Sequence, residues 1–240
     1  MPRRIGTDRR SFFLYHRGMR FPRRVYAEVL GLAPRLLRTR FGAALLLLAL
    51  ILIWLESRGL DPRTTVLQSG ALSAVIGAAW VAGNARDRAA LATALTHPTT
   101  PLAIATGRWM AVVLPAALLT TLCTAITGTP VSAAAAGVLT AAAVGAFALA
   151  IVLALGSGAA ITLFLFMAIA GAVAPEQLVG LAHPGMARLA AASALELGPA
   201  LWHYRDVATG DWAAMLHAFA WTGLGILFAS AVVARHRTDD

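Results

Sequence analysis

The sequence predicts an all-α polytopic membrane protein, and three observations lead to this fold class. Of the 240 residues, 59% are hydrophobic and only 13% are charged, whereas soluble domains have about 45–50% apolar and about 25% charged residues. The mean hydropathy is +0.73. Apolar runs of helical length alternate with polar segments along the chain. We expect six transmembrane helices in residues 41–240, preceded by an interfacial amphipathic helix, with a re-entrant segment before the last span.

The net charge of +9 lies in the first forty residues. Residues 1–40 hold 11 arginines and two acids, and the rest of the chain holds nine of each. A basic arm on a neutral apolar body is typical of binding to the anionic cytoplasmic leaflet, so we expect membrane lipids and no nucleic acid as its partners. Residues 1–20 are interpreted as an uncleaved cytoplasmic arm, because seven arginines separate the Arg9-Arg10 pair from the first apolar run.

Residues 21–40 predict an amphipathic helix at the membrane interface. Arginines lie mostly off its apolar face, a pattern typical of a helix that lies in the interface rather than crossing the bilayer. Pro34 suits the first position of a second short helix. The apolar residues recur at spacings of four, four, three and four: Phe21, Val25, Val29, Leu32 and Leu36.

Six apolar runs define the predicted spans. The first has 15 residues, which give about 22 Å of helix, and flanking arginines are expected to extend it to the interface. Pro115 is expected to kink the third span. The alanine-rich fourth span indicates either close helix packing or a bias in base composition. The spans are residues 41–55, 66–83, 109–126, 131–155, 159–174 and 213–234.

The distribution of arginine predicts the orientation. Residues 1–40, 85–108 and 235–237 are rich in arginine, whereas acids balance or exceed arginine in residues 56–65 and 175–212. By the positive-inside rule, both termini and residues 85–108 face the cytoplasm.

Two connections are more than simple links. Residues 85–101 have polar ends and a helical middle, in which the leucines share one face and proline ends the pattern; the residues are Arg86, Asp87, Arg88, Leu91, Leu95 and Pro98. Residues 175–212 are long for a loop and are expected to fold back onto the outer face of the bilayer. Their defining residues are a glycine–proline break and aromatics suited to the interface, Gly198, Pro199, Trp202, Tyr204 and Trp212.

The sequence contains no pattern typical of catalysis or metal binding. Cys123 is the single cysteine, and the six histidines form no paired ligand motif, so we interpret them as surface residues. No acid or arginine falls well inside a predicted span, which argues against proton-coupled transport. Every basic residue is arginine, so a P-loop lysine is excluded and any nucleotide must be hydrolysed by another chain. We expect no enzyme activity, metal or cofactor in this chain.

The order of these elements resembles the membrane subunit of a bacterial ABC exporter of the type-2 permease class, over about residues 20–240. In that family an acidic residue opens a cytoplasmic coupling segment, a leucine pair and a proline follow, and a glycine–lysine pair begins the third span. The corresponding residues here are Asp87, Leu91, Leu95, Pro98 and Gly107-Arg108. The chain lacks the family's internal glycine and second glutamate in this segment.

The resemblance implies that residues 21–40 are the elbow helix, residues 85–101 the coupling segment and residues 175–212 the extracellular re-entrant segment. It also implies an ABC ATPase partner that carries ATP and Mg, a homodimer or a heterodimer with a second permease, and a bacterial cytoplasmic (inner) membrane. The chain is then expected to export a substrate by alternating access. The alternative hypothesis is a non-transporting integral membrane scaffold or assembly subunit.

Overall fold

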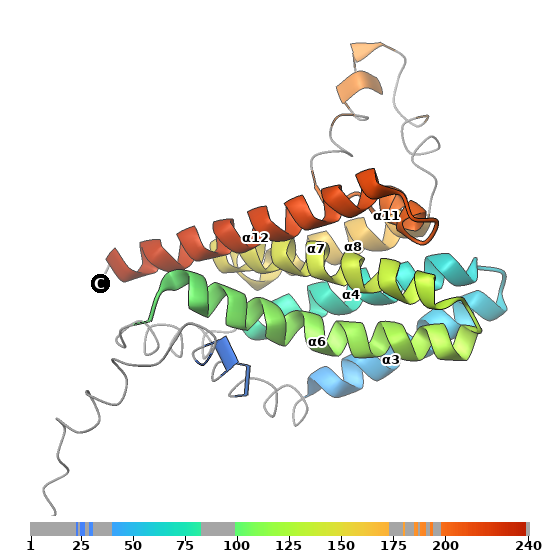
Figure 1. Ribbon diagram of the computed structural model, residues 1–240, viewed down its shortest axis with the longest axis horizontal. Coiled ribbons are helices and arrows are strands. Elements are labelled where there is room, and N and C mark those ends of the chain that lie inside the picture. Colours follow the sequence, from blue (N-terminus) through green and yellow to red (C-terminus); the bar gives the residue numbers. More distant parts are fainter. Residues whose placement is uncertain are drawn as a thin grey trace, which may run out of the picture.

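The protein is a bundle of long antiparallel helices in the computed structural model (Figure 1). The structure describes residues 23, 25–26, 29–30, 40–82, 99–172, 180, 185–186, 188–190, 193 and 198–238. This part of the chain contains helices and no strand, so the predicted all-α class is confirmed. The helices are α3 (Arg40–Ser57), α4 (Pro62–Ala82), α6 (Pro101–Thr127), α7 (Val131–Leu155), α8 (Ser157–Ala172), α11 (Leu201–Val207) and α12 (Trp212–Thr238).

Five helices are long and apolar enough to cross a membrane, judged by length and composition: α3, α4, α6, α7 and α12. The chain therefore has the character of a multi-pass helical membrane protein. The fifth predicted span, residues 159–174, corresponds to α8, which has 16 residues. That length gives about 24 Å of helix, less than the roughly 30 Å of a hydrocarbon core.

The helix of the third predicted span begins eight residues earlier than expected, at Pro101 rather than Trp109. Thr100 is its N-cap, with its hydroxyl accepting a hydrogen bond from the Ala103 amide at 3.2 Å, and Pro101 occupies the first turn, where proline is favoured. The sequence prediction was wrong here because it kept Arg108 outside the span. The helix continues through Pro115 without interruption.

The second span also begins earlier than predicted, at Pro62 instead of Val66. The Asp61 carboxylate accepts a hydrogen bond from the Thr64 amide at 3.0 Å and another from the Thr64 hydroxyl at 3.1 Å. This side-chain cap fixes the first turn of α4. By contrast, α7 has the bounds predicted from the sequence, and α12 extends the last predicted span by one residue before it and four after it.

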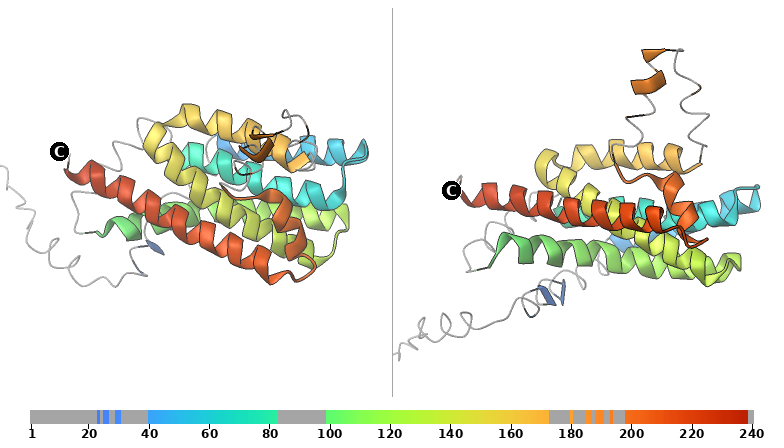
Figure 2. Two further views of the ribbon diagram at one scale, coloured as in Figure 1. Left: turned by 90° about the horizontal axis from the view of Figure 1, so that it is seen from above. Right: turned by 45° about the horizontal axis from the view of Figure 1, so that its top comes forward.

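Helices α4 and α7 form the centre of the bundle. Helix α3 packs on α4, helix α8 packs on α4 and α7, and α6 and α12 complete the layer around α7 (Figures 1 and 2). Most of α4 is buried, whereas α3 and α12 bury only a small part of their surface and carry rows of exposed leucine and phenylalanine. These outer faces match a hydrocarbon surrounding. Many alanines of α7 are buried at its helix contacts, which agrees with the close-packing interpretation of this alanine-rich span.

The two ends of the bundle differ in charge. Neighbouring helices alternate in direction, so the start of α3, the start of α6 and the end of α12 share one end (Figure 1). The described charges toward that end include Arg40, Arg108, Arg235 and Arg237, with no described acid. We call this the arginine end. The described charges of the opposite end, with the connection from α8 to α11 included, are Glu56, Arg58, Asp61, Arg63, Arg188, Arg205, Asp206 and Asp211.

Candidate functional site

The predicted site residues fall into three groups, of which the structure describes one completely. The coupling residues Arg86, Asp87, Arg88, Leu91, Leu95 and Pro98 lie outside the described residues. Of the elbow residues, Val25 is buried and Val29 is half-buried, whereas Phe21, Leu32 and Leu36 lie outside the described residues. All five residues of the re-entrant group are described.

Helices α4 and α6 flank the predicted coupling segment, and Arg108 links them. The Arg108 side chain is 2% exposed, and its Nη1 donates a hydrogen bond to the Val81 carbonyl at 3.3 Å. Val81 lies in the last described turn of α4. The guanidinium therefore joins α6 to the end of α4 at the arginine end of the bundle.

At the other end, helix α11 covers the bundle. It packs against α7 and α12 and, less extensively, against α4 and α8. Four side chains in and just before α11 are buried, so this segment packs into the bundle end: Pro199, Leu201, Tyr204 and Val207. Trp202 is half-buried, and Trp212, at the start of α12, is 75% exposed.

One hydrogen-bonded group connects α11 to α12, and we call it the cap cluster (His203, Tyr204, His217 and Trp221). Nδ1 of His217 lies 3.2 Å from the Tyr204 hydroxyl, and the Trp221 indole N–H donates to Nε2 of His217 at 3.1 Å. The His203 and His217 rings are edge-on to each other, with centroids 5.6 Å apart. Trp221 in turn meets Phe147 of α7 edge to face at 5.5 Å.

The cap cluster is polar but not suited to catalysis. Burial raises the pKa of the Tyr204 phenol above its ordinary value, so the phenol stays protonated at neutral pH. Both ring nitrogens of His217 are occupied by protein partners. Within the described part of the chain, no group of three or more histidine, cysteine or acidic residues is placed to hold a metal ion.

Sequence reasoning missed this cluster. It placed Tyr204 in an interfacial segment but interpreted the histidines as surface residues, whereas His203 and His217 are half-buried and meet. The residues come from two elements, so no short motif contains them all. The one local signal is the spacing of His217 and Trp221, which places them on one face of a helix.

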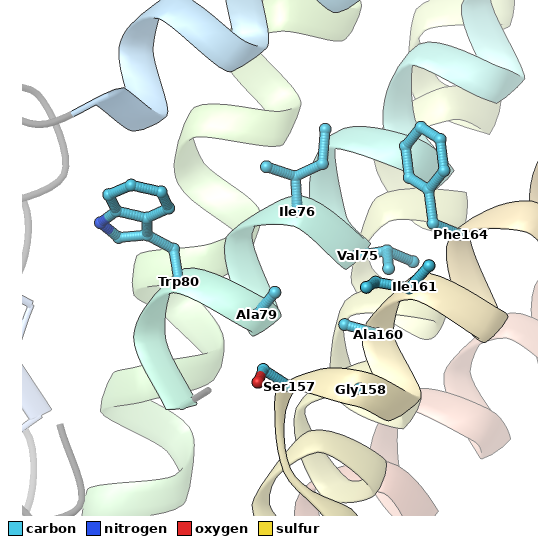
Figure 3. A pocket seen from close by; sticks show the side chains of 9 residues that line it. All are labelled: Val75, Ile76, Ala79, Trp80, Ser157, Gly158, Ala160, Ile161 and Phe164. Carbon is cyan, nitrogen blue, oxygen red and sulfur yellow. The ribbon is translucent and has the colours of Figure 1, made fainter. Parts of the chain in front are cut away.

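A pocket of about 420 Å³ lies between α4 and α8 (Figure 3). Its lining residues are mainly apolar and come from these two helices: Val75, Ile76, Ala79, Trp80, Ser157, Gly158, Ala160, Ile161 and Phe164. Trp80 lies near the end of α4, and Ser157 begins α8, so the pocket lies toward the arginine end. The Phe41 ring of α3 packs against Trp80 with centroids 6.0 Å apart.

The pocket can hold an apolar group and offers few polar contacts. None of its lining side chains titrates, so it provides no general acid or base. Ser157 and the Trp80 indole are the side chains in the lining that can form hydrogen bonds. Pockets with this size and character are suited to hydrophobic ligands.

Comparison with protein-family models, curated proteins and solved structures found no match to the chain.

Proposed function

We propose that the chain is the transmembrane permease subunit of an exporter driven by a separate ABC ATPase. The proposal carries over the resemblance of the sequence to type-2 ABC permeases. It assigns ATP and Mg to the partner ATPase, and it places the chain in a bacterial cytoplasmic membrane with both termini inside. A second permease copy, identical or not, completes the transporter.

The observation that supports this function best is the position of the two helices on either side of residues 83–98. Helix α4, on one side, is the most buried of the candidate spans, and α6, on the other, is joined to it through Arg108 and Val81. A protein that binds this connection can therefore act on the centre of the bundle. A scaffold subunit needs no such arrangement.

The charge distribution supports the same orientation. The described charges of the arginine end are all positive, while acids and arginines balance at the opposite end. By the positive-inside rule, this distribution favours a cytoplasmic arginine end, where an ATPase is available. In this proposal α8 is the fifth of the six spans and α12 is the sixth.

The apolar pocket supports a transport role in a more general way. It lies against α4, so a displacement of α4 relative to α8 changes its shape. A pocket that changes with a driven helix is what alternating access requires.

Purification from the host membrane tests the proposal. The tagged chain, extracted in a mild detergent, should co-purify with an ABC ATPase in near-stoichiometric amount, and the complex should hydrolyse ATP. The chain separated from that partner should not. Co-purification with other membrane proteins and no ATPase would favour the scaffold alternative, and ATP turnover by the chain alone would exclude the permease proposal.

A further inference from the structure

We propose that His217 is a proton-sensitive latch that holds helix α11 against α12. Neutral His217 keeps the cap cluster joined, and protonation of its ring weakens the attachment of α11, so that α11 leaves the end of the bundle more often. This inference does not rest on the transporter proposal, because it concerns two helices within one chain.

The hydrogen bonds define the protonation state of His217. The indole N–H of Trp221 can only donate, so Nε2 of His217 must accept and carries no hydrogen. A neutral imidazole has one N–H, which is therefore on Nδ1 and points to the Tyr204 oxygen at 3.2 Å. His217 thus bridges a tryptophan of its own helix and a tyrosine of α11.

Protonation breaks this bridge on one side. A proton added to Nε2 faces the indole N–H across 3.1 Å, so two donors oppose each other. The ring must then turn or move away, and a ring that turns also loses its alignment with Tyr204. Trp221 packs on Phe147 of α7, so the indole has little freedom to follow.

Histidine is the side-chain type whose charge ordinarily changes between about pH 5 and 8, and other titratable groups surround the latch. From α11, the titratable and charged side chains are His203, Tyr204, Arg205 and Asp206, and Asp211 lies in the turn that leads into α12. Helix α7 has no titratable residue. Helix α6 has two, Arg108 and Cys123, of which Arg108 donates to α4 and Cys123 is fully buried.

Release of the latch has a defined structural consequence. Helix α11 has seven residues, and a short turn connects it to α12. The side chains of α11 that pack against the bundle are Leu201, Tyr204 and Val207, each at most 4% exposed. If the bridge to α12 is lost, the apolar side of α11 and the bundle end beneath it become accessible to water.

Thiol labelling of the full chain in permeabilised membranes tests the latch. In a Cys123→Ala background, single cysteines replace buried Val207 and, separately, exposed Thr209. Both cysteines are labelled with a water-soluble maleimide at about pH 8 and at about pH 5, on either side of the ordinary histidine range. The rate at the buried position is divided by the rate at Thr209, because this ratio removes the intrinsic pH dependence of thiol reactivity. The same ratio is measured with Leu201→Cys as a second buried position, so that a local effect of Val207→Cys is recognised.

The matched control is His217→Gln, because a glutamine amide can accept from Trp221 and donate to Tyr204 without titrating. In the wild-type background the ratio should rise about fivefold on acidification, the effect of losing one ordinary hydrogen bond on an opening equilibrium. In His217→Gln it should not change with pH, and in His203→Gln it should rise as in wild type. A wild-type ratio that stays constant, an equal acid-dependent rise in His217→Gln, or loss of the rise in His203→Gln would overturn the proposal.

Discussion

Arg108 is the charged side chain that the described part of the bundle buries most completely, at 2% exposure. A buried guanidinium is costly unless its N–H groups are hydrogen-bonded, so each bond that the bundle offers Arg108 matters for stability. The bond from Nη1 to the Val81 carbonyl joins this side chain to α4. Arg108 is therefore a structural link between α4 and α6.

Replacing Arg108 should destabilise the bundle. In Arg108→Leu the Val81 carbonyl loses this donor, and we expect a loss of about 1–3 kcal/mol in the free energy of unfolding, measured by thermal or denaturant unfolding in detergent. Arg108→Lys keeps the charge and a donor and should lose less. Equal stability of Arg108→Leu and the wild type would show that the link contributes nothing.

Tyr204 predicts a stability change at alkaline pH. Burial raises its pKa in the folded protein, so above about pH 10 the unfolded chain loses the phenolic proton while the folded chain keeps it. Stability is then complete below the unfolded pKa and falls by up to about 1.4 kcal/mol per pH unit above it. Tyr204→Phe should remove this part of the alkaline loss, and Tyr26→Phe, at a position that is 65% exposed, should not. Identical alkaline profiles for wild type and Tyr204→Phe would contradict the account.

At the scale of elements, the contact between α4 and α7 depends on two glycines. A Cβ on Gly70 would collide with the carbonyl oxygen of Gly137, and a Cβ on Gly137 would collide with the Thr120 methyl group. The helices can approach this closely because neither position has a side chain. Hydroxyl groups join α6 to the same region of α4. The Ser69 hydroxyl donates to the Val66 carbonyl of its own helix and lies 3.4 Å from the Thr120 hydroxyl of α6.

The Gly70→Ala substitution should therefore separate the two central helices. The added methyl group meets backbone rather than a mobile side chain, so we expect a loss of about 1–3 kcal/mol in stability. Gly223→Ala is the matched control, because a Cβ there has nothing within 4 Å and alanine in a helix gains about 0.5–1 kcal/mol over glycine. Unfolding midpoints in detergent distinguish the two, and a neutral Gly70→Ala would contradict the close approach.

The elements could be predicted from sequence to different degrees, and the reasons are local. Apolar composition located the long helices. The predicted bounds of α7 were correct because a proline precedes the helix and a glycine follows it. The start of α6 was missed because Arg108 was treated as an interfacial charge, although its partner lies in α4. The start of α4 was missed because its cap, Asp61, precedes polar residues rather than apolar ones. A tertiary contact explains why the start of α6 was missed, and a local side-chain cap explains why the start of α4 was missed.

For the whole molecule, the orientation is the next testable property. Single cysteines at Ser57 and Thr209, both exposed at one end of the bundle, should react with a membrane-impermeant thiol reagent in intact cells carrying Cys123→Ala. A cysteine at Thr96, in the predicted cytoplasmic segment, should react only after permeabilisation. Labelling of Thr96→Cys with protection of Thr209→Cys would invert the orientation.

The sites were less predictable than the fold, because they depend on which helices meet. The described residues 198–207 pack at the bundle end, but the role of Tyr204 depends on His217, which lies on the next helix. The pocket joins α4 to α8, whose lining residues are about eighty positions apart in the chain, and none of them stands out from its neighbours in the sequence. Residues 85–98 of the predicted coupling segment lie outside the described residues, so their role stays a prediction.

The measurement that tests the central proposal most directly is ATPase binding to the predicted coupling segment. Burial of each leucine in an interface is worth about 1.5–3 kcal/mol, so Leu91→Asp with Leu95→Asp should weaken the complex by at least about a hundredfold. Ala89→Asp with Thr93→Asp adds the same charge to the opposite face of the predicted helix and should retain the partner. We expect the leucine variant to insert at the wild-type level but to lose the co-purifying ATPase and its ATP hydrolysis. Retention of the ATPase at wild-type yield by the leucine variant would contradict it.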